Sequence, residues 1–149
     1  NALDLVASGS TLARRMLAHP YPIIAACPGH AVAKGAFLLL SSDYRIGVKG
    51  PFNIGLNEVQ IGMTMHHVGI ELSRDRLGKA AFQRSVINGE MFDPQGALDA
   101  GFLDRLVEPE ALMASAREVA SQLLKIKQDY NSALVSLDKA IELDKQYGF

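Results

Sequence analysis

The sequence predicts an α/β fold in which helices cover a small sheet. Strand-like and helix-like segments alternate up to about residue 108, which is the order typical of this class. The chain has 149 residues, of which 48% are hydrophobic, so it is long enough for one domain with a core and too short to divide comfortably into two. The remaining residues are helical in pattern and indicate an appended cap or an assembly element.

The first half of the chain shows the order helix, strand, helix, strand. Apolar residues at helical spacing predict a helix over Leu3–Ala18, which the prolines that follow would end. Ile23–Cys27 is a short apolar run closed by Pro-Gly, as expected for a buried strand that enters a tight turn. Lys34–Ser41 is uniformly apolar after its second residue and predicts a buried helix. Tyr44–Val48 then alternates as a strand does.

The middle of the chain is less regular. Phe52–Gly62 has no strong period, and we expect a short strand followed by a loop rich in Gly and Asn. Loops of this kind often carry functional residues. Met65–Leu77 and Lys79–Ile87 have the pattern of two helices separated near Gly78.

The next helix has clear boundary signals. Asp93 is a good N-cap and Pro94 suits the first helical position, while Gly101 suits a left-handed C-cap. Phe102–Val107 is then strand-like. The expected strands are short and few for a complete sheet, so their exposed edges favour either a fragment or an oligomer that covers them.

Two further helices are expected at the C-terminus. Pro109 opens the first, whose apolar face is formed by Leu112, Ala116, Val119, Leu123 and Ile126. The second, separate helix has its own apolar stripe, formed by Leu134, Leu137 and Ile141.

Charge and cysteine content exclude several classes of partner. The 15 Lys and Arg residues nearly balance the 16 Asp and Glu residues, so nucleic acid and anionic membranes are not expected as partners. Cys27 is the only cysteine, which rules out an internal disulfide and a thiolate zinc site and favours a cytoplasmic location. The longest apolar stretches are far shorter than the ~20 residues that span a bilayer. The chain starts at Asn1 rather than Met, so a fragment of a longer protein stays open as an alternative.

The chain has no nucleophile elbow, phosphate loop or dinucleotide fingerprint, which excludes several enzyme classes. For the histidine pair and the cysteine, a structural role is favoured over a chemical one. His66 and His67 are adjacent, so their side chains would point about 100° apart on a helix and suit packing or capping better than one metal ion. Cys27 ends an apolar strand and is expected to be a small buried residue rather than a nucleophile.

The turn between the first strand and the second helix is the first candidate site. It contains Pro28-Gly29 and leads into Lys34-Gly35, so the backbone N–H groups at the start of the helix are free and point in one direction. The helix dipole favours negative charge at the same place, and such a turn can hold an oxyanion. An ordinary strand–turn–helix connection would have the same pattern.

Glu58 is the second candidate, because it is a single carboxylate among apolar residues. Apolar surroundings disfavour the charged form of a carboxyl group and suit it to accept and return a proton. This property is what a base acting on a carbon acid requires. The alternative is a solvent-facing glutamate in a loop.

Taken together, these stretches resemble the crotonase superfamily, the enoyl-CoA hydratases and isomerases. The resemblance covers about residues 20–110, and the ordered series is more specific than any one piece. The matching stretches are 21–26, 29–31, 33–38, 42–46, 52–62 and 93–104.

The resemblance implies a crotonase-like α/β fold, a spiral core of repeated ββα units with C-terminal helices for trimerisation. Residues 1–108 would be the C-terminal portion of that core, and residues 109–149 the helical trimerisation region. Relatives are longer at the N-terminus, and the portion that this sequence lacks supplies core strands, part of the CoA site and one of two oxyanion-hole N–H groups. The implied assembly is a homotrimer or a hexamer built as a dimer of trimers.

The resemblance also implies residue roles. The backbone N–H of Lys34, and with it that of Gly35, corresponds to the second oxyanion donor, although relatives commonly have Gly at position 34. Hydratases use two glutamates, whose positions are Phe37 and Glu58 in this sequence. Phe37 would line the acyl pocket, where a phenyl ring cannot activate water.

The resulting hypothesis is an enoyl-CoA isomerase of fatty acid metabolism with Glu58 as its single base. The mitochondrial Δ3,Δ2-enoyl-CoA isomerases likewise have an apolar residue at the first glutamate position. An acyl-CoA or enoyl-CoA is the expected substrate, and no metal or redox cofactor is expected. Two alternatives stay open: hydration or another crotonase-type reaction on an acyl-CoA, and a non-catalytic acyl-CoA-binding scaffold.

Overall fold

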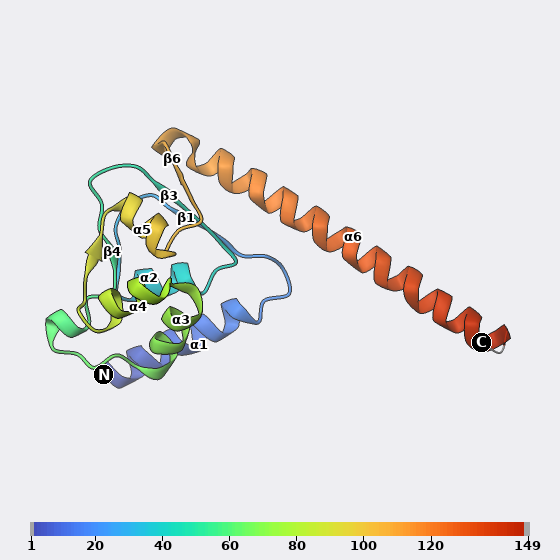
Figure 1. The fold of residues 1–149 in the computed structure, drawn as a ribbon, viewed down its shortest axis with the longest axis horizontal. Coiled ribbons are helices and arrows are strands. Elements are labelled where there is room, and N and C mark those ends of the chain that lie inside the picture. The colour runs from blue at the N-terminus through green and yellow to red at the C-terminus, as the bar shows by residue number, and fades with distance from the viewer. Residues whose placement is uncertain (1, 148–149) are drawn as a thin grey trace.

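The computed structural model describes residues 2–147 and has two sheets surrounded by helices (Figure 1). The helices are α1 (Ala2–Leu17), α2 (Lys34–Leu40), α3 (His67–Arg76), α4 (Lys79–Val86), α5 (Pro94–Ala100) and α6 (Leu112–Tyr147), with the 3-10 turns η1 (Val59–Ile61) and η2 (Pro109–Ala111). The strands are β1 (Ile24–Cys27), β2 (Ala31–Val32), β3 (Tyr44–Val48), β4 (Ile54–Gly55), β5 (Met91–Phe92) and β6 (Arg105–Val107).

Each of the two sheets has three strands, and the strands of the two sheets are interleaved along the chain. One sheet has the order β1-β3-β6 and is parallel throughout, with Ala26 opposite Ile46. The other has the order β2-β4-β5, in which β2 runs parallel and β5 antiparallel to β4. The predicted α/β class is confirmed. Strands β2 and β5 were not predicted, because they have two residues each and are too short to show a period.

The core forms two apolar clusters, one on each side of the longer sheet. The first contains Phe37 of α2 and Phe102, which are 1% and 0% exposed, and residues of α3, α4 and α5 pack around them. The second lies between β3 and the start of α6, where Ile46 meets Ala116 and Val119. Helix α2 is therefore buried, as its uniformly apolar sequence predicts.

The boundary signals of α5 act as predicted. The carboxylate of Asp93 accepts a hydrogen bond from the backbone N–H of Gly96 at 2.6 Å, and Pro94 is the first helical residue. Gly101 ends the helix with φ of 97°, a left-handed conformation that suits glycine. The strand expected over Phe102–Val107 is confirmed only at its end, over Arg105–Val107.

The C-terminal region differs from its prediction, because α6 is one continuous helix rather than two. The sequence between the two predicted stripes has neither Gly nor Pro, so nothing interrupts the helix. Its buried face ends at Leu123, and Ile126 is 62% exposed instead of buried. The side chains of the second stripe, Leu134, Leu137 and Ile141, lie outside the described residues. Beyond its first turns, α6 projects away from the sheets (Figure 1).

Within residues 2–147, no helix combines the length and the apolar character that crossing a bilayer requires.

An ion pair between a buried guanidinium and a partly exposed carboxylate joins the longer sheet to the segment after α5. The guanidinium of Arg45 on β3 donates to both carboxylate oxygens of Asp104, at 2.7 and 2.6 Å, and to the carbonyl oxygen of Gly101 at 3.0 Å. The backbone N–H of Arg45 donates to the same carboxylate at 2.8 Å. Arg45 is 6% exposed, so its charge depends on this partner for compensation.

Replacing Asp104 by Ala should therefore lower the free energy of unfolding by about 3 kcal/mol, because it leaves a buried guanidinium without its counter-ion. Urea denaturation measures this change. Glu108→Ala is the matched control, since it removes the exposed partner of Lys49 and should cost less than about 1 kcal/mol. Equal costs for the two variants would contradict the role assigned to Asp104.

Candidate active site

A cavity of about 710 Å³ lies between α1, the start of α2 and the segment from Glu58 to His66. Its wall is mostly apolar, and it brings together three of the four site residues predicted from the sequence: Lys34, Phe37 and Glu58. Gly35 does not line it. The lining residues are Leu5, Val6, Ser8, Gly9, Leu12, Ala33, Lys34, Phe37, Glu58, Ile61, Met63, Thr64 and His66.

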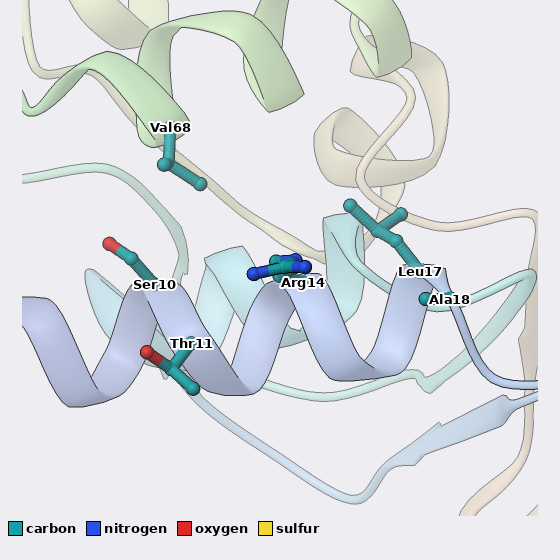
Figure 2. Close-up of a pocket in the computed structure, with 6 residues that line it drawn as sticks. All are labelled: Ser10, Thr11, Arg14, Leu17, Ala18 and Val68. Atoms are coloured by element: carbon teal, nitrogen blue, oxygen red, sulfur yellow. The ribbon is translucent and has the colours of Figure 1, made fainter.

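A second pocket of about 540 Å³ runs along α1 and contains none of the predicted site residues. Figure 2 shows Val68 of α3 pointing toward α1 across this pocket. Cys27 lies elsewhere, buried at the end of β1, with its thiol donating to the carbonyl oxygen of Gly29. Its prediction as a small buried residue is confirmed.

The turn before α2 directs the first residues of this helix at the cavity. The backbone N–H of Ala33 donates to the carbonyl oxygen of Gly55 at 2.9 Å, which ties the turn to β4. Ala33 has φ of 51°, unusual for a residue with a side chain, and it cannot cap the helix through its methyl group. The N–H groups of the first helical turn have no acceptor within the helix. The start of α2 at Lys34 therefore places hydrogen-bond donors beside a mostly apolar cavity.

Glu58 lies in the wall of the cavity and is almost fully buried. The residue is 7% exposed, and within the described part of the chain its Oε2 atom has no hydrogen-bond partner. It precedes η1 without capping it through the side chain, while its carbonyl oxygen accepts from the N–H of Met63 at 2.9 Å. The solvent-facing alternative is therefore wrong. A buried acceptor without a partner is costly, and among the described residues Glu58 shares this condition with Asn57 Oδ1, Arg76 Nε and Ser85 Oγ.

The side chain of Lys34 turns toward α1. Its ammonium donates to the carbonyl oxygen of Gly9 at 2.6 Å and lies 5.9 Å from the ring centre of Phe37. Gly9 allows this approach, because a Cβ atom there would lie 2.6 Å from Lys34 Cε. Partial burial lowers the pKa of Lys34 from its ordinary value.

Phe37 and His66 form one wall of the cavity together. The Phe37 ring is 1% exposed and its centre lies 5.0 Å from that of His66, with the ring planes tilted by 40°. His66 caps α3, since its Nδ1 atom accepts from the N–H of Gly69 at 2.8 Å, and the capping interpretation is confirmed. Its place in the Glu58 cavity was missed, because only the fold brings it beside Phe37. No group of residues suited to holding a metal ion occurs in the described part of the chain.

The comparison with known families decides the assignment. The sequence profile described as enoyl-CoA hydratase/isomerase matches residues 4–149. The chain belongs to the enoyl-CoA hydratase/isomerase family. Its two-sheet arrangement is the crotonase-like fold, as the resemblance implies.

Solved structures of the family superpose well on this chain. An enoyl-CoA hydratase/isomerase family protein from Pseudomonas syringae is 67% identical with a TM-score of 0.81, covering 97% of this chain and 67% of its own. A protein from Mycobacterium tuberculosis, described in one structure as an enoyl-CoA isomerase and in another as a probable enoyl-CoA hydratase, is 38% identical in the first of these with a TM-score of 0.82, covering 89% of this chain and 58% of its own.

Curated relatives have both isomerase and hydratase names. Human mitochondrial enoyl-CoA delta isomerase 1 is 30% identical over 105 residues, 70% of this chain and 35% of the relative. The (E)-benzylidenesuccinyl-CoA hydratase of Thauera aromatica is 29% identical over 126 residues, 81% of this chain and 49% of the relative. The chain therefore spans about a third to a half of the length of these relatives.

Replacing Glu58 by Leu should raise the free energy of unfolding by about 1 to 3 kcal/mol, because it removes a buried oxygen that lacks a partner. Urea denaturation of the variant measures the gain. Glu71→Leu on α3 is the control, since Glu71 is exposed and its replacement should change stability little. A loss of stability in Glu58→Leu would mean that the carboxylate holds the fold together.

Proposed function

We propose that the protein is an enoyl-CoA isomerase, which moves the double bond of a 3-enoyl-CoA thioester to the 2-position. The observation that carries the proposal is the buried Glu58 carboxylate, which lines an apolar cavity together with the start of α2 and with Phe37. One carboxyl group is enough for this reaction, because the same base can take a proton from C2 and return one at C4.

The proposed reaction has two steps. The thioester oxygen binds at the backbone N–H of Lys34, and Glu58 takes a proton from C2. The electron pair of the broken C–H bond moves into a dienolate whose charge lies largely on the thioester oxygen, where each preorganised donor contributes about 3 kcal/mol. Glu58 then returns the proton at C4, the double bond forms between C2 and C3, and no net charge or redox change results.

Phe37 supports isomerisation over hydration. A hydratase must activate water and hold it beside C3, and a phenyl ring has neither donor nor acceptor for that purpose. The ring packs against His66 in the wall of the cavity. The hydratase name of the Thauera relative keeps hydration as the second candidate, and addition of water to a 2-enoyl-CoA at a useful rate would favour it.

Residues 109–149 are proposed as the assembly region of a homotrimer or a dimer of trimers, beside the core region 1–108. Met113, Leu124 and Val135 are spaced by 11 residues, so they share one face of α6, and they are 55%, 41% and 69% exposed. An exposed apolar stripe on a projecting helix suits contact between subunits. A cytoplasmic location, and no nucleic acid or membrane as partner, remain predictions.

Replacing Glu58 by Gln should abolish isomerisation of 3-enoyl-CoA while leaving affinity for the thioester nearly unchanged, because the amide keeps the shape but cannot accept the C2 proton. The 2-enoyl-CoA product is followed by its absorbance, and affinity by calorimetry. Glu71→Gln, which alters an exposed carboxylate, should keep full activity. Full activity in Glu58→Gln would rule out Glu58 as the base.

Sedimentation velocity should give the mass of a trimer or hexamer, and Leu124→Glu with Val135→Glu should shift it to the monomer, because charges replace the exposed apolar stripe. Lys125→Glu is the control, since Lys125 is exposed about 100° away from Leu124 around α6. A monomeric wild-type protein would contradict the proposed assembly.

A further inference from the structure

His66 has one ring nitrogen committed to the fold. Its Nδ1 atom accepts a hydrogen bond from the backbone N–H of Gly69 at 2.8 Å, and this bond caps the start of α3. A nitrogen that accepts a hydrogen bond has no proton of its own, so a neutral ring has its proton on Nε2. The cap therefore selects the tautomer in which Nε2–H is a donor.

The position of the ring is equally restricted. It packs on Phe37 with 5.0 Å between ring centres, and a Cβ atom at Gly69 would lie 2.9 Å from its Cε1 atom and 2.6 Å from Phe37 Cζ. Only a residue without a side chain leaves room for both rings beside the helix. The ring is thus held by a backbone bond on one side and by an aromatic face on the other.

The same cavity contains a donor and an acceptor that complement each other. His66 and Glu58 both line it, and Glu58 Oε2 has no partner within the described residues. Most of the other lining side chains are apolar and offer no hydrogen bond. The side chain of Lys34, the strongest donor in the wall, already bonds to Gly9.

We propose that His66 is a positioning residue for Glu58, with Nε2–H donating to the carboxylate through one water molecule in the cavity that both residues line. With one oxygen of Glu58 held in this way, the other oxygen carries the proton between C2 and C4 of the bound thioester. Phe37 assists by supporting the ring at the place where hydratases have a second carboxylate. The kinetic part of this proposal rests on the proposed isomerase function.

His66→Asn separates positioning from capping. The Asn side chain is a good N-cap and can accept from Gly69 N–H, but it lacks the ring Nε2–H. We expect kcat for 3-enoyl-CoA to fall roughly 10- to 100-fold, the size of losing one hydrogen bond to a charged group. KM and the urea midpoint should stay close to the wild-type values.

His67→Asn is the matched control, because His67 is adjacent in sequence and exposed, and it should leave kcat unchanged. His66→Ala adds the loss of the cap and should lower the urea midpoint as well. A His66→Asn variant with wild-type kcat would overturn the proposal and leave His66 as a cap alone.

A spectroscopic test does not depend on activity. Long-range ¹⁵N–¹H correlation spectra resolve the ring nitrogens of each histidine, and Glu58→Gln should move the Nε2 resonance of His66 while those of His67 stay in place. An unmoved His66 signal would overturn the proposal. A shifted signal in a protein without isomerase activity would support the positioning contact while rejecting the proposed reaction.

Discussion

The short parallel pairing of β2 with β4 is the constraint on which the candidate site depends. Val32 lies opposite Gly55, so β2 and β4 end at the same edge of the sheet. Lys34 follows the end of β2 by two residues, and Glu58 follows the end of β4 by three. Parallel strands place their carboxyl ends together, and ligands in open α/β sheets bind outside that edge. The N–H of Ala33, bonded to the carbonyl oxygen of Gly55, extends the pairing into the turn and sets the direction of α2. The helix start and the carboxylate thus meet through a ladder of a few backbone bonds.

Arg45 and Glu58 are both buried ionisable residues, but they differ in whether their polar atoms have hydrogen-bond partners. Arg45 is buried with a bidentate carboxylate and a backbone carbonyl around it, so the cost of removing its charge from water is offset by its bonds. Glu58 is buried with an oxygen that has no partner, so its cost is not offset. A fold tolerates such a group only when other contacts supply the stability, as the two apolar clusters and the Arg45 pair do in this chain.

The elements that depend on local sequence signals could be predicted from the sequence. The α5 helix was predictable because Asp93 and Gly101 act on their own neighbours, and α2 because a uniformly apolar helix must be buried. The strands β2 and β5 were not, since two residues have no period and their pairing partners are distant in sequence. The continuity of α6 depended on the absence of any breaking residue, a weaker signal than two apolar stripes. His66 was correctly expected to cap, but its contact with Phe37 arises only when α3 packs on α2, as 29 residues separate the two rings.

The wall formed by Phe37 and His66 bears on the choice between isomerisation and hydration in the proposed function. Both reactions need an oxyanion site and one carboxyl group near C2, and in the proposed function of this chain both lie beside the β2–β4 pairing. They differ in whether a second polar group holds water at C3. In this chain that place has a phenyl ring with 1% of its surface exposed, so a water molecule there would lose hydrogen bonds that no neighbouring phenyl atom replaces. His66 adds a donor nearby but has only Nε2–H to offer, since Nδ1 is occupied by α3. A neutral imidazole restricted to donating cannot take the proton of a water molecule, so the histidine supports the existing carboxylate and does not replace the missing one.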